Sequence, residues 1–161
     1  MKAYSDTDFA ACPLTRRSTT GTLIMYNDAP IALQSKRQSH VCPSTHTAEY
    51  VAAFRSAMHL TTLRNFLYEL SHAPTELTPL YIDNTASIAT ATAQFPTPHA
   101  RHIDVKYHWI REQISQGIII KPILISSNLN PADVFTKSLE PAQFTSKLPL
   151  LRLTAPATRG D

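Results

Sequence analysis

The feature that most constrains the fold is a series of apolar residues with helical spacing in the first half of the chain. These residues recur every three or four positions: Ala53, Ala57, Leu60, Leu63, Leu67 and Leu70. The spacing predicts a helix over residues 45–71 with one continuous buried face, begun by Ser44 or Thr45 as the N-cap. One turn before this face stands Glu49, so the helix would place a carboxylate at the edge of the core.

Five short segments are predicted to form strands. They are rich in β-prone residues and bounded by turn formers: residues 2–6, 20–26, 31–35, 80–83 and 118–125. A turn joins the second and third segments as a hairpin, and Pro122 favours an edge position or a bulge in the fifth. If the first and fourth strands are neighbours, Asp6 and Asp83 end side by side. Ligand sites in open α/β sheets favour such strand ends.

Further helical segments complete the pattern. We predict helices over residues 85–93 and 100–116, the second ended by Gly117, and a closing helix that begins at Asn130 and Pro131. The order of the elements indicates an α/β fold, a five-stranded mixed sheet with helices packed on it. We expect one domain over residues 1–148 and a disordered tail over residues 149–161.

Length and charge limit the class of protein. With 161 residues and a net charge of +3, the chain suits one domain and is compatible with a polyanionic partner. Cys12 and Cys42 lack the spacing of a metal finger, so free thiols are predicted. The most apolar run is too short to span a bilayer, and the N-terminus lacks the apolar stretch of a signal peptide. We therefore expect an intracellular protein, cytoplasmic or nuclear, that is neither secreted nor inserted in a membrane.

Four acidic residues stand in different elements, where a folded chain could gather them: Asp6, Glu49, Asp83 and Asp133. Clustered carboxylates bind hard divalent cations, and a pair of such ions is a standard device for cleaving phosphodiesters. Each acid taken singly also fits an ordinary role, such as capping a turn or complementing a helix dipole. Taken together, they favour a metal-dependent nuclease.

The histidines offer a weaker metal hypothesis. His99, His102 and His108 lie close in sequence, but their spacing matches no common zinc motif. Because His102 and His108 are six positions apart, they do not stack on one helix face. A structural or packing role is favoured for all three.

The chain carries, in this order, the segments YSDTDFA, TRRSTTG, SKRQ, STHTAEYVA, LYIDNTASI, HARHIDVKYHWIRE and NPADVFTKSL. Together these segments resemble the ribonuclease H domain of copia-type LTR retrotransposon Pol polyproteins, over residues 4–148. The resemblance implies a ribonuclease H-like fold and cleavage of the RNA strand of an RNA–DNA hybrid. It also implies two Mg²⁺ ions, for which Mn²⁺ could substitute. Asp6, Glu49, Asp83 and Asp133 would then be the catalytic and metal-binding acids.

The resemblance directs attention to possible contacts with the hybrid. Asn84 follows Asp83 and could hydrogen-bond a 2′-hydroxyl, although a helix cap is an equally good role. Basic side chains could contact phosphates, although each also fits a solvated loop: Arg16, Arg17, Lys36 and Arg37. Ribonuclease H enzymes often carry a mobile histidine before the last acid; residues 126–131 contain none, so Asn128 or Asn130 would line that side. The reverse transcriptase of the same polyprotein is a second expected partner.

Two alternatives remain open at this stage. Family members usually carry Trp where this chain has Phe9, another Trp near Leu33, and an acid where it has Thr47. These departures and the lone-domain length are compatible with a catalytically decayed or co-opted module that binds or tethers nucleic acid. A different nuclease on the same fold, such as an integrase-like enzyme that cuts DNA, is the other alternative.

Overall fold

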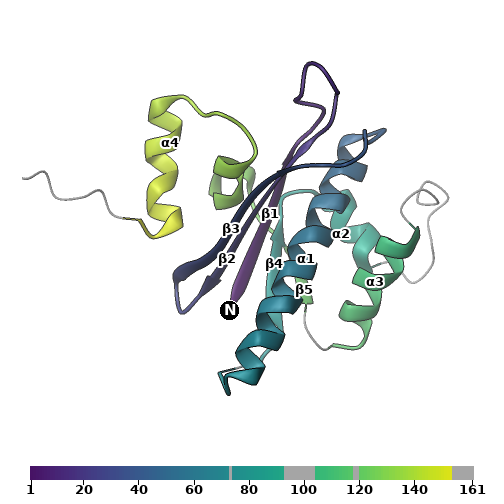
Figure 1. Cartoon of the computed structure of the whole chain (residues 1–161), viewed down its shortest axis with the longest axis vertical. Helices are drawn as coiled ribbons and strands as arrows, with labels where there is room; N and C mark the ends of the chain where they lie inside the picture. The colour runs from purple at the N-terminus through teal and green to yellow at the C-terminus, as the bar shows by residue number, and fades with distance from the viewer. Residues whose placement is uncertain (73, 93–103, 118–119, 154–161) are drawn as a thin grey trace, which may run out of the picture.

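Figure 1 shows the computed structural model of the chain, in which residues 1–72, 74–92, 104–117 and 120–153 are described. Within these residues five strands form one mixed sheet: β1 (Lys2–Asp8), β2 (Thr19–Tyr26), β3 (Ala29–Arg37), β4 (Thr78–Ile82) and β5 (Ile120–Leu124). Their order is β3-β2-β1-β4-β5, with β1 antiparallel to β2 and parallel to β4. The predicted α/β class and five-stranded mixed sheet are confirmed, and β5 lies at an edge, as Pro122 indicates.

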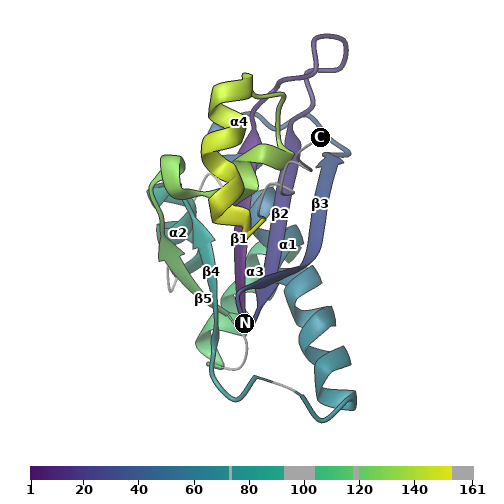
Figure 2. The same ribbon diagram turned by 90° about the vertical axis from the view of Figure 1, so that its left-hand side faces the viewer.

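Helical segments lie on both faces of the sheet (Figures 1 and 2). One face carries α1 (Thr45–Glu69), α2 (Thr85–Thr92) and α3 (Asp104–Ser115), and the other carries the 3-10 helix η3 (Pro131–Phe135) and α4 (Pro141–Lys147). Two further 3-10 helices are η2 (Ser127–Leu129) and η4 (Leu148–Leu151). The main core lies between the sheet and α1, where Ile24 and Leu80 pack with Tyr50 and Leu60. Among the described helices, none is both long and apolar enough to cross a membrane.

Helix α1 confirms the predicted helix closely, but its buried face is shorter than expected. Its N-cap is Ser44, whose hydroxyl accepts a hydrogen bond from the Thr47 amide at 3.1 Å. Ala53, Ala57 and Leu60 are buried, whereas Leu70 is 53% exposed. The prediction of one continuous buried face is therefore wrong for the last turns, because these turns extend beyond the strands (Figure 2). Gly117 ends α3 with a φ of 62°, as predicted.

The C-terminal part differs from the single closing helix that was predicted. Asn130 caps η3 and Asp133 lies in its first turn, as expected, but η3 ends at Phe135 and a separate helix begins at Pro141. Proline lacks an amide hydrogen and fits only the first turn, so Pro141 starts a new helix. The folded chain also continues past the expected boundary at residue 148, because Leu151 is buried against Leu23 and Met25. Residues 154–161 of the predicted tail lie outside the described residues.

The parallel pairing of β1 and β4 brings two predicted acids together. The register places Tyr4 beside Tyr81, and the two rings stack with their centroids 4.9 Å apart. Asp6 and Asp83 each follow two residues later, so they reach the same end of the sheet. The predicted neighbourhood of Asp6 and Asp83 is thereby confirmed.

Two close contacts fix η3 against the sheet. Asn130 is fully buried, and its side-chain amide donates to the Ser5 carbonyl at 2.9 Å while its side-chain oxygen accepts from the Ala132 amide at 3.1 Å. Gly21 on β2 lies so close to η3 that a Cβ added there would stand 2.4 Å from the Ala132 carbonyl oxygen and 2.8 Å from Thr136 Cγ2. The backbone of η3 therefore occupies the space that any other residue at position 21 would need.

We expect Gly21→Ala to destabilise the protein by about 3 kcal/mol, because the methyl group meets backbone that cannot move without displacing η3. Thermal or urea unfolding measures this change. Gly117→Ala is the matched control: a Cβ there meets nothing within 4 Å, so only the left-handed φ of 62° adds a cost of about 1 kcal/mol. Equal losses in the two variants would contradict the close packing of η3 on β2.

Candidate active site

Three carboxylates meet at the ends of β1 and β4. Asp6 comes from β1, Asp83 directly follows β4, and Glu49 projects from the second turn of α1. Each contributes one oxygen to a group in which all the oxygens lie within 4.8 Å of one another. They line a cavity of about 520 Å³, together with Asp133 and Lys137. Three of the four predicted acids thus form one tight cluster, and the fourth borders the same cavity.

Burial and mutual repulsion disturb the ionisation of this cluster. Asp6 and Glu49 are each only 6% exposed. Burial, followed by the charges of Asp83 and Asp6, raises the pKa of Glu49 to about 9. Burial and the charge of Asp83 raise the pKa of Asp6 to about 6, although a hydrogen bond from Thr136 opposes the shift. Asp6 and Glu49 therefore hold a proton above the pH at which isolated acids lose theirs.

Asp133 is held in a different way from the other three acids. Its two oxygens pair with separate lysines, Oδ1 with Lys137 Nζ at 2.8 Å and Oδ2 with Lys147 Nζ at 2.9 Å. Burial alone would raise the pKa of Asp133, but the hydrogen bonds from Lys137 and Lys147 outweigh it and lower the pKa below its ordinary value. Asp133 thus stays ionised beside Asp6 and Glu49, which retain protons more readily.

Lys147 and Thr136 complete the site, and neither was anticipated from the sequence. The ammonium group of Lys147, on α4, also donates to the Ser127 and Asn130 carbonyls at 3.2 and 3.4 Å. Thr136 Oγ1 donates to Asp6 Oδ2 at 2.9 Å. The i,i+4 spacing of Asp133 and Lys137 could have indicated their ion pair. No local pattern indicates Lys147 or Thr136, because their partners lie on other elements.

The predicted substrate-binding residues do not form one cluster. Asn84 Oδ1 accepts a hydrogen bond from the Ser87 amide at 2.9 Å, so it acts as a helix cap, and a contact with a 2′-hydroxyl stays a prediction. Arg16 and Arg17 lie in the exposed loop between β1 and β2. Lys36 and Arg37 are neighbours on β3 and therefore point to opposite faces of the sheet. Their contacts with phosphates likewise stay predictions.

The loop before Asp133 separates the roles of its two asparagines. Asn128 lines the acidic cavity together with Ser127, whereas Asn130 is fully buried and ties η3 to β1. Of the three histidines, His99 and His102 lie outside the described residues, and the side chain of His108 is not among those described.

Known proteins resemble this chain in sequence and in fold. No protein-family model matches the chain. Its sequence is 38% identical, over 137 residues, to the retrovirus-related Pol polyprotein from transposon TNT 1-94 of Nicotiana tabacum; the match covers 85% of this chain and 10% of the polyprotein. The fold is similar to that of RNase H1 from the halophilic archaeon Halobacterium salinarum NRC-1, with a TM-score of 0.62, 14% identity, and coverage of 84% of this chain and 92% of that chain.

The chain is a ribonuclease H-fold relative of retrotransposon Pol polyproteins. The resemblance to the copia-type ribonuclease H domain and the predicted ribonuclease H-like fold are both confirmed. The chain spans about a tenth of the length of the polyprotein that it matches. A second solved structure, LC11-RNase H1 in complex with an RNA/DNA hybrid, has a TM-score of 0.59 and 15% identity, and the match covers 83% of this chain and 91% of that chain.

The donor atoms of this ribonuclease H-fold site suit a hard divalent cation. All of them are carboxylate oxygens, which Mg²⁺ and Mn²⁺ prefer. Within the described part of the chain, Glu49 Oε2 and Asp83 Oδ1 are buried and have no hydrogen-bond partner. A buried oxygen without a donor is costly, and a cation shared with Asp6 would satisfy both atoms.

We expect the metal-free protein to become less stable as the pH rises from about 4.5 to about 9. In this range unfolded Glu49 is ionised while folded Glu49 keeps its proton, so the folded state binds more protons and stability falls with pH. Glu49→Gln should remove most of this slope and raise the Tm at pH 8 by about 3 °C or more. Thermal melts in a chelator over this pH range measure the effect.

The exposed Glu76 provides the control for this measurement, since Glu76→Gln also removes one acid but lies away from the cluster. It should keep the slope of the parent protein. A Glu49→Gln variant with the parent's slope would show that Glu49 is not the group that binds the extra proton.

Proposed function

We propose that this domain is a metal-dependent endonuclease that cleaves the RNA strand of RNA–DNA hybrids, as in retrotransposon reverse transcription inside the cell. The observation that carries the proposal is the cluster of Asp6, Glu49 and Asp83 at one end of a ribonuclease H-fold sheet. The similarity to LC11-RNase H1, whose structure contains an RNA/DNA hybrid, supports the choice of substrate. The homology to a retrotransposon Pol polyprotein supports the biological setting.

In the proposed mechanism Asp6, Glu49 and Asp83 would hold Mg²⁺, with Mn²⁺ able to substitute, and Asp133 would complete the set of ligands. Two ions bound there would supply an activated water and stabilise charge on the leaving 3′ oxygen, so that the products are a 3′-hydroxyl and a 5′-phosphate. Bound cations would offset the burial and the mutual repulsion that raise the pKa values of Asp6 and Glu49. The acids would then act as carboxylates at neutral pH.

Residues of the chain itself would orient the reacting groups. Thr136 Oγ1 fixes one oxygen of Asp6, and Lys147 fixes one oxygen of Asp133 from its anchored position on the loop carbonyls. Lys137 pairs with Asp133 but keeps 47% of its side chain exposed, so it can also present positive charge to a phosphate entering the cavity. Recognition would rest on backbone and shape rather than on base sequence.

One observation favours the alternative of a non-catalytic module that binds or tethers nucleic acid. Each oxygen of Asp133 forms an ion pair with a lysine, and these ammonium groups compete with a metal ion for the same carboxylate. If the lysines stay paired with Asp133, that residue cannot bind a metal ion, and the proposed metal site has one ligand fewer. In either case we propose that the hybrid is the partner, and that the reverse transcriptase of the same polyprotein is a second one.

We expect the protein to cleave a labelled RNA–DNA hybrid in the presence of Mg²⁺ or Mn²⁺, and to leave RNA and DNA duplexes intact. Asp83→Asn should reduce the rate by about a hundredfold or more, since a lost metal ligand removes several kcal/mol of transition-state stabilisation. Asp28→Asn is the matched control, because Asp28 lies in an exposed turn and its ion pair within the described residues is a surface pair with Lys2.

Gel analysis of the products separates the possible results. Cleavage of a DNA duplex in preference to the hybrid would favour the integrase-like alternative. A folded protein that binds the hybrid and cuts nothing would refute the nuclease and leave the tethering module.

A further inference from the structure

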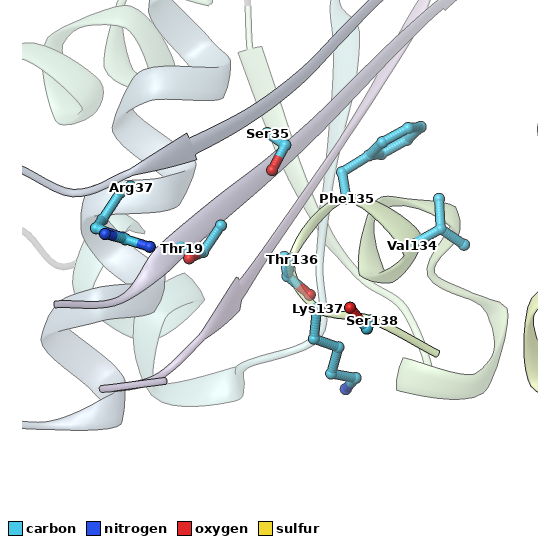
Figure 3. A pocket seen from close by; sticks show the side chains of 8 residues that line it. All are labelled: Thr19, Ser35, Arg37, Val134, Phe135, Thr136, Lys137 and Ser138. Atoms are coloured by element: carbon cyan, nitrogen blue, oxygen red, sulfur yellow. The ribbon is translucent and has the colours of Figure 1, made fainter. Parts of the chain in front are cut away.

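A second hollow adjoins the acidic cavity on the face of the sheet that carries η3 (Figure 3). Its volume is about 520 Å³. Strands β2 and β3 form one side, and the segment that ends η3 forms the other: Thr19, Ser35, Arg37, Val134, Phe135, Thr136, Lys137 and Ser138. Lys137 lines both this hollow and the acidic cavity, so the two spaces meet at its side chain.

The side chains of this hollow suit an anion. Arg37 and Lys137 contribute positive charge, and Thr19, Ser35 and Ser138 contribute hydroxyl groups, while no lining residue is acidic. Arg37 is exposed and, among the described residues, forms no ion pair, so its guanidinium is available to a ligand. Guanidinium groups and hydroxyls are the usual protein donors to phosphate oxygens.

The register of the sheet sets the position of the hollow relative to the acids. Asp8 pairs with Thr19, which pairs with Arg37; two residues along each strand, Asp6 pairs with Gly21, which pairs with Ser35. Residues directly opposite each other share a face, so these side chains lie on the face that holds η3. Because neighbouring strands are about 4.8 Å apart, Arg37 stands about 10 Å from β1.

This separation matches a short stretch of nucleic-acid backbone. A nucleic-acid strand carries a phosphate at every nucleotide, so a strand with one phosphate at the acids has others a few nucleotides along, within reach of Arg37. Gly21, which has no side chain, leaves the row between Asp6 and Ser35 clear for η3, and the exposed Lys137 stands between the two spaces. A backbone leaving the acidic cavity would therefore meet positive charge on its way to Arg37.

We propose that the hollow lined by Arg37, Lys137 and Ser35 is a phosphate-binding site for the same strand that enters the acidic cavity. It would hold a phosphate a few nucleotides from the bond that is cut. This inference rests on the proposed function and extends it, because it names the residues that set the path of the cleaved strand. Arg37 would act as a binding residue and takes no part in the bond cleavage.

The first test measures binding without turnover, in the Asp83→Asn background. Adding Arg37→Gln should weaken binding to a hybrid about five- to tenfold and should reduce the slope of log K against log salt by about one, as expected for one lost phosphate contact. Arg37→Lys should recover only part of the affinity, because lysine keeps the positive charge but lacks the two parallel N–H donors of the guanidinium group. Lys121→Gln is the control. It removes one positive charge from β5, at the edge of the sheet opposite β3, and this variant should bind like the parent. The Tm of each variant verifies that it is folded.

The second test locates the phosphate. A single methylphosphonate linkage, which removes one backbone charge, is placed at successive positions in either strand of the hybrid. The positions at which the parent protein cuts each hybrid are then mapped. Methylphosphonate at one position in the cleaved strand, a few nucleotides from a given bond, should suppress that cut about fivefold. When the Arg37→Gln protein is used, the same methylphosphonate linkage should not reduce cleavage further.

The outcomes separate this inference from the proposed function. If the parent protein binds no hybrid, the proposed function is refuted, and so is the assignment of a hybrid phosphate to the hollow. A parent that binds while Arg37→Gln binds equally well refutes the phosphate site alone. Sensitivity that lies in the DNA strand, or that persists in Arg37→Gln, also overturns the assignment.

Discussion

The crowding of three carboxylates in a nearly buried corner is the constraint on which the rest of the molecule depends. Asp6, Glu49 and Asp83 repel one another, and the surrounding protein offers them few hydrogen bonds. Such a cluster persists only because rigid elements bring it together: two parallel strands and the start of a long, well-packed helix. The energy stored in this arrangement is released when protons or cations arrive, which is why the site is suited to metal binding.

The fourth acid shows a different solution to the same problem. Asp133 belongs to the face of the sheet opposite α1, and its charge is already balanced by Lys137 and Lys147. The site therefore has a charged half that is neutralised internally and a half that must be neutralised from outside. Lys137, which pairs with Asp133, lines the same hollow as the exposed Arg37, so positive charge gathers on this face beside the acidic cavity.

The sequence predicts the acidic half of the site better than the basic half, and the reason is physical. Glu49 follows from the periodicity of α1, and Asp6 and Asp83 follow from the ends of adjacent strands, since each signal is local. Lys147 meets Asp133 only through the packing of α4, which the predicted single closing helix did not contain. The separation of Lys36 from Arg37 depends on the strand register, which a list of basic residues does not reveal. The exposed end of α1 was also missed, because periodicity shows which side chains share a face but not how far the sheet beneath them extends.

The hydrogen bond from Asn130 to the Ser5 carbonyl joins residues that are 125 positions apart. Contacts of such sequence separation form late in folding, since the whole intervening loop must be closed before they contribute. On a ribosome, β1 would wait for almost the entire chain to emerge before η3 could dock beside it. The acids of β1, α1 and β4 could assemble earlier, but Asp133 and its lysines could not. Assembly of all four acids is thereby tied to completion of the domain, so a partly synthesised chain would carry three of the acids without Asp133 and the lysines that pair with it.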